Sequence, residues 1–205
     1  MTTYGAMQTR IADELIRDDL TSQIQNAIKT AIKYYERERF WFNENRAYTT
    51  TVADQEYYEL PSDFVGIDTL TITINSNKYP LTPRSWEHIE EENTGTSSQS
   101  GYPEEFAIYQ GQFRLYPVPN TSGWTLTLAY IKQFTTPSSS SDTSPWFVEA
   151  EPLIRTRAKF ELFSHVIYEL ELAQLMAQME ERELHSLLRL TSKQRATRTL
   201  RPTTF

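Results

Sequence analysis

The three histidines have the widest chemical repertoire of the side chains in this sequence, and they stand far apart. His88, His165 and His185 form neither an HxxxH nor an HExxH pair, the spacings that place two imidazoles on one helix face for a metal. His88 does have Glu91 and Glu92 at helical spacing, an arrangement that binds a divalent ion weakly. A solvated, charged helix face explains the same residues without any ligand, and we favour it. We therefore expect no metal site.

Catalysis by acid–base or nucleophilic groups has equally little support. The run Glu90–Glu92 offers carboxylates, yet general acid–base work needs two carboxyl groups in different environments, and nothing here supplies the second environment. The serines cluster in loops without a neighbouring histidine, and no GxSxG, P-loop or GxGxxG motif occurs. The absence of cysteine excludes disulfides, thiolate metal sites and a cysteine nucleophile. The sequence therefore predicts that this protein is not an enzyme and has no cofactor.

Charge is distributed unevenly along the 205 residues. The chain has 20 Lys and Arg against 27 Asp and Glu, a formal net charge of −7. Residues 191–205 contain Lys193, Arg195, Arg198 and Arg201 and no acid, so this end carries +4 and the preceding residues carry −11. A basic, sparsely apolar end on an acidic body is typical of an interaction arm, and a frayed, solvated terminus is the alternative. Tight wrapping of nucleic acid is disfavoured, because phosphate binding needs a basic surface.

Two helices are expected at the start of the chain. The first has Thr9 as its N-cap. The second begins with a capping box made by Ser22 and Gln25 and should end near Phe40. Its apolar side chains recur at spacings of three and four residues, which predicts one buried face: Ile24, Ala27, Ile28, Ala31, Ile32 and Tyr35.

The middle of the chain is typical of short β-strands. Residues 48–52 and 56–60 resemble the two strands of a hairpin, and residues 106–109 and 112–116 resemble a second hairpin. Ser85 can cap a short helix between them.

Two further segments, 67–74 and 124–131, alternate in hydropathy as half-buried strands do. The alternation predicts two buried faces, the first made of Leu70, Ile72 and Ile74, and the second of Trp124, Leu126, Leu128 and Tyr130.

The last part of the chain is helical and too long to be straight. Residues 135–145 are Ser, Thr or Pro apart from Asp142, which predicts a surface loop or linker. A straight helix over residues 153–195 would be about 65 Å long at 1.5 Å per residue. A compact domain of this size is only about 43 Å across. We therefore expect a break near residues 168–172, with the second helix running out of the body.

Together these elements predict an α+β fold. The N-terminal helices (1–47) and the C-terminal helices (146–190) form one helical core, into which an antiparallel β-rich region (48–134) is inserted. Residues 135–145 form the linker, and residues 191–205 form an extended, basic C-terminal arm.

Several fragments of the sequence occur in an order that resembles the head-to-tail adaptor, or connector, proteins of short-tailed bacteriophages. The sequence is similar to the tail accessory factor that lies beneath the portal, over roughly residues 8–190. The fragments are Arg10–Leu15, Tyr34–Glu44, Tyr57–Phe64, Gly101–Pro103 and Phe113–Pro119, followed by Tyr130, Trp146 and the long terminal helical region. The Ser/Thr-rich segment 135–145 and the missing turn signal near 168–172 depart from the family pattern.

This resemblance implies a structural virion protein of the head–tail neck, present in the host cytoplasm during assembly. In such families a homo-oligomeric, dodecameric ring binds the portal protein, its helical bundle builds the ring, and its other side supports the tail nozzle or tube and often fibres. DNA passes through the ring lumen without specific binding, which suits an acidic body that repels it. The resemblance implies no membrane contact.

The resemblance also gives the basic arm a role, that of portal binding. The residues concerned are Lys193, Arg195, Arg198, Arg201 and Phe205. The arginines would pair with acidic groups on a neighbour or on the portal through their planar guanidinium groups, and Phe205 would be an apolar anchor.

Two alternatives remain open at the level of sequence. One is a tail-completion or tube-terminating protein at another level of the same neck, which differs in its partner. The other is a virion-associated cell-wall hydrolase, which would need a pair of carboxylates in a cleft.

Overall fold

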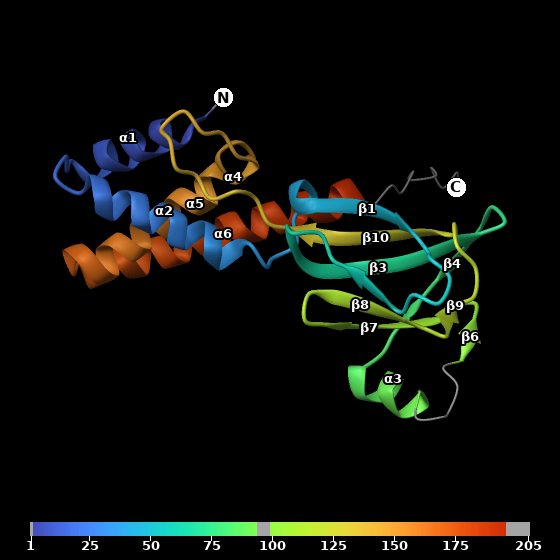
Figure 1. Ribbon diagram of the computed structural model, residues 1–205. Coiled ribbons are helices and arrows are strands. Elements are labelled where there is room, and N and C mark those ends of the chain that lie inside the picture. The colour runs from blue at the N-terminus through green and yellow to red at the C-terminus, as the bar shows by residue number, and fades with distance from the viewer. Residues whose placement is uncertain (1, 94–98, 196–205) are drawn as a thin grey trace, which may run out of the picture. The chain divides into compact units, whose positions relative to one another are not determined.

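The computed structural model describes residues 2–93 and 99–195, which divide into two compact units. The helical unit comprises residues 1–43 and 134–205, and the β unit comprises residues 44–133 (Figure 1). Helices and largely antiparallel sheets are both present, so the predicted α+β class is confirmed. Because the β unit interrupts the helical unit, helices from both ends of the sequence share one core.

The helical unit is built from two separate stretches of sequence. Its described elements are α1 (Tyr4–Leu15), α2 (Thr21–Tyr35), η1 (Trp41–Asn43), α4 (Pro145–Val148), α5 (Glu151–Leu162), η2 (Phe163–Ile167) and α6 (Leu170–Arg195).

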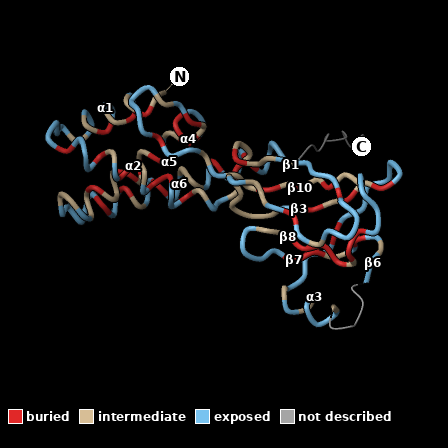
Figure 2. Tube along the Cα trace, viewed as in Figure 1, coloured by how far each residue is buried: buried red, intermediate tan, exposed pale blue. Residues whose placement is uncertain are grey.

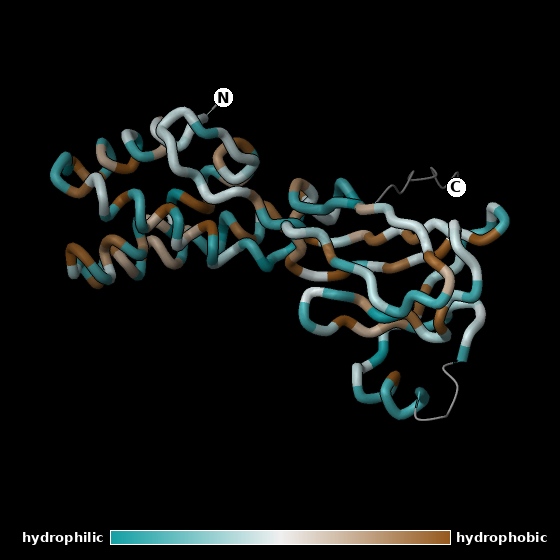
Figure 3. Tube along the Cα trace, in the orientation of Figure 1, coloured by the Kyte–Doolittle hydropathy of each residue, from teal (hydrophilic) through white to brown (hydrophobic). Residues whose placement is uncertain are grey.

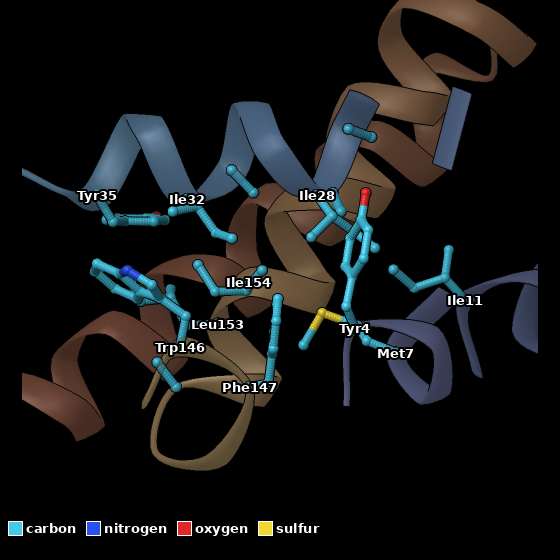
Figure 4. Close-up of a cluster of buried hydrophobic side chains, with 14 of the residues drawn as sticks. Tyr4, Met7, Ile11, Ile28, Ile32, Tyr35, Trp146, Phe147, Leu153 and Ile154 are labelled. Carbon is cyan, nitrogen blue, oxygen red and sulfur yellow. The ribbon is translucent and has the colours of Figure 1, made fainter. Parts of the chain in front are cut away.

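The core of the helical unit is formed by the inward faces of α1, α2, α4 and α5, as Figure 2 shows by burial. All six apolar residues predicted on α2 are buried, so that prediction is confirmed. Aromatic rings join the separate stretches of chain. Tyr4 stacks on Phe147 with ring centres 5.8 Å apart (Figure 4). Phe40 meets Trp146 edge-on, also with ring centres 5.8 Å apart. Each buried aliphatic or aromatic side chain of this kind stabilises the fold by about 1.5–3 kcal/mol.

The predicted helix caps are wrong. Helix α1 begins five residues before the expected Thr9 cap, because the Thr3 hydroxyl accepts a hydrogen bond from the Ala6 N–H at 3.1 Å. Helix α2 begins after Leu20 without any side-chain cap, so the capping box of Ser22 and Gln25 does not form. Burial of the Leu20 side chain in the core fixes this helix start instead.

Helix α2 also ends earlier than predicted, at Tyr35 rather than near Phe40. The chain then makes a turn of 3-10 helix, η1, and Asn43 stabilises that turn from within. Its side-chain oxygen accepts from the Phe40 N–H at 2.9 Å, and its amide nitrogen donates to the Glu38 carbonyl at 2.8 Å. These two local hydrogen bonds offer the backbone an alternative to continuing the helix.

The Ser/Thr/Pro segment 135–145 is a loop that packs on the first turn of α1. The N–H groups of Tyr4 and Gly5 donate to the carbonyls of Asp142 and Ser140, each at 2.9 Å. A Cβ atom on Gly5 would lie 2.9 Å from the Ser140 carbonyl oxygen, closer than side chains tolerate. The close approach of loop and helix therefore requires glycine at this position.

The predicted break in the C-terminal helical segment is confirmed. Helix α5 ends at Leu162, the π-helical turn η2 follows, and Tyr168 adopts the left-handed conformation with φ of 63°. Helix α6 starts two residues later and packs against α5. A bulky residue in the left-handed region cannot continue a right-handed helix, so the chain changes direction here.

The β unit contains two four-stranded sheets and one two-stranded pair. One sheet has the order β1 (Glu44–Thr50), β10 (Thr125–Lys132), β3 (Phe64–Ile74), β4 (Asn77–Pro80). The other has the order β2 (Tyr57–Glu59), β8 (Gln112–Tyr116), β7 (Glu105–Tyr109), β5 (Thr82–Pro83). The remaining elements are the parallel pair β6 (Ser100–Gly101) and β9 (Val118–Pro119), and the helix α3 (Trp86–Glu92).

The first predicted hairpin is wrong and the second is confirmed. Strand β1 pairs with β10, and β2 pairs with β8, so residues 48–52 and 56–60 belong to different sheets. Strands β7 and β8 do pair with each other. They are joined through Gln110 and Gly111, which have φ of 50° and 79° and so suit the tight two-residue turn of a hairpin.

The inner faces of the two larger sheets supply the core of the β unit. The predicted inward residues Leu70, Ile72 and Ile74 on β3 are buried, and Leu126, Leu128 and Tyr130 are buried on β10. Trp124 precedes β10 and is only partly buried. The predicted helix cap Ser85 is confirmed, since its hydroxyl accepts from the His88 N–H at 3.2 Å at the start of α3.

Candidate partner-binding surfaces

The predicted arm is described only in its first part. Lys193 and Arg195 lie in the last turn of α6, where their charges suit the negative end of the helix dipole. Residues 191–195 thus continue the helix, whereas Arg198, Arg201 and Phe205 lie outside the described residues. The role of these five residues in partner binding stays a prediction.

Helix α6 is held to the helical unit by a buried polar cluster. The Tyr35 hydroxyl on α2 donates to the carboxylate of Glu180, which is only 8% exposed. Arg157 on α5 donates to Glu180 at 3.2 Å and to Glu161 at 2.6 Å, and its guanidinium lies 3.9 Å from the centre of the Tyr34 ring. Burial, followed by the hydrogen bond to Glu180, raises the pKa of Tyr35 far above its ordinary value. The cluster fixes which side of α6 faces inward.

A second apolar stripe on α6 faces away from the core of its own unit. Ala173, Met176 and Leu187 are among the buried residues of this helix. Leu172, Leu175 and Met179 are between 39% and 48% exposed. At 100° per residue these three side chains lie within about 60° of one another and about 100° away from the buried stripe. Both apolar and polar positions lie along the helices of this unit (Figure 3). A helix with two apolar faces is typical of one that packs on two partners.

The turns at two helix ends expose further large apolar residues. Ile16, which follows α1, has φ of 53° and is 90% exposed, and Tyr168, which precedes α6, is 76% exposed. A β-branched residue in the left-handed region is costly, since its Cβ approaches the following carbonyl. The N–H of Ile16 bonds to the carbonyls of Ala12 and Asp13, and that of Tyr168 bonds to the carbonyl of Phe163, so these conformations close the helix ends.

An aromatic surface with a buried arginine lies on the β unit. Arg114 on β8 is 3% exposed, and its guanidinium lies 5.4 Å from the centre of the Tyr57 ring and 5.2 Å from that of Trp86. Its Nε donates to Glu56 at 2.9 Å, and its Nη1 donates to Glu90. The arginine therefore joins α3 to the sheet through two carboxylates and two rings.

Of the residues first considered for chemistry, His88 and Glu92 line one hollow together with Glu104 and Glu105. The Nε2 atom of His88 lies 3.5 Å from a carboxylate oxygen of Glu105. No group of three His, Cys, Asp or Glu in residues 2–93 and 99–195 has the geometry of a metal site. A second hollow on the β unit, of about 560 Å³, has one carboxylate, that of Glu104, in its lining. None of the helices in the described ranges is long and apolar enough to cross a membrane.

Sequence reasoning missed both the apolar stripe of α6 and the aromatic surface around Arg114. Apolar residues recur along α6, but only the contacts of Glu180 show which of them face inward. The partners of Arg114 are 58 and 24 residues away in sequence, so nothing local signals them.

Comparison with known proteins identifies a matching family. The sequence profile of the family described as SU10 adaptor protein matches residues 2–203. No curated protein matches the chain. The profile match covers both structural units and both surfaces described above, including α6 and the face that carries Arg114.

Proposed function

Since the chain belongs to the SU10 adaptor protein family, we propose that it forms the head-to-tail adaptor ring that joins the portal to the tail of a bacteriophage. The protein is a phage adaptor and a virion component with a structural role. The observation that carries the proposal is the match to this family over residues 2–203, nearly the whole chain. The apolar stripe of α6 supports it, because an adaptor needs surfaces for neighbouring proteins.

Neighbouring copies meet through the stripe of Leu172, Leu175 and Met179. A ring requires a heterologous contact, in which one surface of each copy meets a different surface of the next, and a closed rotation. A stable contact of standard size buries about 800 Å² per partner, so the stripe supplies its centre and polar side chains supply its rim. The polar cluster around Glu180 holds the stripe outward in every copy.

The ring gives DNA a passage through its lumen and does not bind it specifically. The β unit contains twelve Asp and Glu against five Lys and Arg, a net charge of −7, whereas the helical unit is neutral overall. An acidic wall repels the phosphate backbone, so DNA slides past it.

The basic end of the chain binds the portal protein, and the opposite side of the ring binds the tail nozzle or tube and its fibres. Lys193, Arg195, Arg198 and Arg201 pair with acidic groups, and Phe205 is an apolar anchor. Assembly begins in the host cytoplasm, and self-association stays weak until the portal acts as a template. Because the portal acts as the template, assembly is conditional on the portal.

Imaging of the purified protein mixed with portal rings tests the proposal. The expected product is a portal with an added layer of twelve-fold symmetry. A protein that remains monomeric beside unchanged portal rings would contradict it, and co-purification with tube protein alone would favour the tail-completion alternative.

The apolar stripe of α6 and the basic end can be tested separately by substitution. Leu175→Glu places a charge in the stripe and should abolish the added layer. Gln174→Glu adds the same charge at an exposed position outside the stripe and should leave the added layer intact. Deletion of residues 196–205 with Lys193→Gln and Arg195→Gln should abolish portal binding. Unchanged binding in that deletion would exclude the basic end as the portal contact.

A further inference from the structure

The sheet β1–β10–β3–β4 of the β unit ends in two open edges (Figure 1). In the part of the chain that the structure describes, β1 pairs only with β10, and β4 pairs only with β3. All three strand pairings of this sheet are antiparallel. Backbone N–H and C=O groups on the outer sides of residues 46–50 and of β4 can therefore pair with a further strand.

The two edges fit each other because the sheet has an even number of antiparallel strands. Strand direction alternates across the sheet, so β4 of one copy runs antiparallel to β1 of the next when one sheet continues the other. The hydrogen-bonding positions match as well. The N–H groups of Thr51 and Leu81 donate to carbonyls of the neighbouring segments inside the sheet. Backbone groups alternate in direction along a strand, so those of Tyr48 and Lys78 point to the open edges.

The faces of the two edge strands match in the same way. Ala47 lies opposite Leu128 and Tyr79 lies opposite Ile72, so both side chains are on the core side of the sheet. Tyr48 and Lys78, each one residue away, are on the other side. When Lys78 of one copy lies opposite Tyr48 of the next, Tyr79 lies opposite Ala47 and the core sides of the two sheets coincide.

Tyr79 is a side chain that this register would bury. It is 49% exposed although it is on the core side of β4. At the other edge of the sheet, a hollow of about 190 Å³ lies between β1 and β2, and its lining includes Ala47 and the buried residues Phe113 and Leu126. Because alanine is small, it leaves room there for an aromatic ring. Among the described residues that line the hollow, Glu59 alone is charged, and its carboxylate can accept a hydrogen bond from the tyrosine hydroxyl.

The alternative occupant of the edge is β1 of a second copy, since two β1 strands related by a two-fold axis are also antiparallel. The core-side residues of β1 are Asn45, Ala47 and Thr49, which are too small to fill the hollow. Charge also favours β4, whose one charged residue is Lys78, because the hollow carries the opposite charge of Glu59.

We propose that β4 of one copy pairs with β1 of the next, so that their four-stranded sheets form one continuous antiparallel sheet. Three backbone hydrogen bonds join the strands: Tyr48 and Lys78 exchange two, and the Arg46 N–H donates to the Pro80 carbonyl. The tyrosine of β4 fills the hollow. Pro80 has no N–H, which limits the pairing to this short stretch. The inference rests on the proposed function, in which copies form a ring, and deepens it, because contact between two different edges is heterologous, as a ring requires.

Disulfide trapping tests the contact, and the absence of cysteine from the chain makes every cross-link interpretable. In the proposed register Asn77 lies opposite Thr49, at a pair without mutual backbone hydrogen bonds, where Cα atoms are about 4.5 Å apart and a disulfide can form. Within one copy the two positions are three strand spacings apart, about 14 Å, which is too far for a disulfide.

The full chain with Thr49→Cys and Asn77→Cys is oxidised in solution and on portal rings, and the products are separated by gel electrophoresis in SDS without reductant. Each copy carries both edges, so the cross-linked species should form a ladder that extends beyond the dimer. A two-fold contact would stop at the dimer. Thr49→Cys alone and Asn77→Cys alone should each give at least tenfold less dimer than a mixture of the two.

Matched variants locate the contact. Thr49→Cys with Lys78→Cys places the sulfur atoms on opposite faces of the joined sheet and should give at least tenfold less ladder than the first pair. Tyr79→Ala, added to the first pair, should reduce the ladder at least fivefold. Tyr109→Ala removes a tyrosine that is 48% exposed in the other sheet and should leave the ladder within twofold. Far-UV circular dichroism checks that each variant is folded.

The inference is overturned by the absence of a ladder in both preparations, by equal ladders from the Asn77→Cys and Lys78→Cys pairs, or by equal losses in Tyr79→Ala and Tyr109→Ala. A strong dimer from Thr49→Cys alone would assign the edge to β1 of a second copy instead. Failure of the proposed function is read separately. A ladder in solution without an added layer on portal rings would support the edge contact and contradict the portal-bound ring, whereas an added layer without a ladder would overturn the edge contact alone.

Discussion

The buried polar cluster of α6 gives the sharpest prediction about stability. Arg157→Met removes the partner of Glu180 and Glu161, whose side chains are 10% and 16% exposed. Breaking a buried ion pair by removing one member costs about 3–5 kcal/mol. Both carboxylates retain some contact with water, and Glu180 keeps its bond from Tyr35, so we expect a loss near the lower limit, about 3 kcal/mol.

Removal of the other member, Glu180, should cost less, and the losses of unfolding free energy in the two single variants should not add up in the double variant. Glu180→Leu leaves the Tyr35 hydroxyl without its acceptor, which costs about 2 kcal/mol. Arg157 still pairs with Glu161 in that variant. In the double variant the apolar replacements pack on each other, and the expected loss is about 3 kcal/mol rather than the sum of about 5. The coupling free energy is therefore about 2 kcal/mol.

Urea denaturation at pH 7 of the four proteins measures this coupling, provided that the slope of unfolding free energy against urea is unchanged. Arg17→Met is the control, because Arg17 and Asp19 form an ion pair with side chains 44% and 57% exposed. Its expected cost is below about 0.5 kcal/mol. Additivity of the two single variants within about 0.5 kcal/mol would refute the cluster as the unit that holds α6.

Three further variants test the packing of the loop on α1, the ionisation of Tyr35 and the attachment of α3 to its sheet. Gly5→Ala should destabilise by about 1–3 kcal/mol although alanine favours helix, because its Cβ meets the Ser140 carbonyl; thermal denaturation measures this, and a stabilised variant would contradict the packing of the loop. In Tyr35→Phe, the free energy of unfolding should fall less steeply above pH 10 than it does in the unchanged protein. A tyrosine whose folded pKa is raised contributes stability that is full below its unfolded pKa of about 10 and is lost as pH rises, so equal alkaline losses in both proteins would exclude this role. Arg114→Lys should speed amide hydrogen exchange in α3 but not in α2, since lysine cannot both stack and bridge Glu56 to Glu90; unchanged exchange would show that α3 is held otherwise.

Local patterns in the sequence determined the elements whose stabilising contacts are themselves local. The buried residues of α2, the alternation of β3 and the hairpin of β7 and β8 follow from periodicity and from a short turn. The break before α6 followed from length alone, since a straight helix would exceed the size of the domain. The family resemblance, carried by short fragments in order, agrees with the matched profile.

Tertiary structure decided what depends on residues distant in sequence. The partner of β1 is β10, more than 70 residues away, because strand pairing is non-local, and a short turn between 48–52 and 56–60 could not reveal it. The side of α6 that faces the core is fixed by the contacts of Glu180 with Tyr35 and Arg157. On the β unit, Arg114 brings together segments that are far apart in the sequence. The charge of −7 in residues 44–133 can be counted from the sequence, because the β unit is one contiguous stretch, whereas the pairing of Arg114 with Glu56 and Glu90 is decided by the fold.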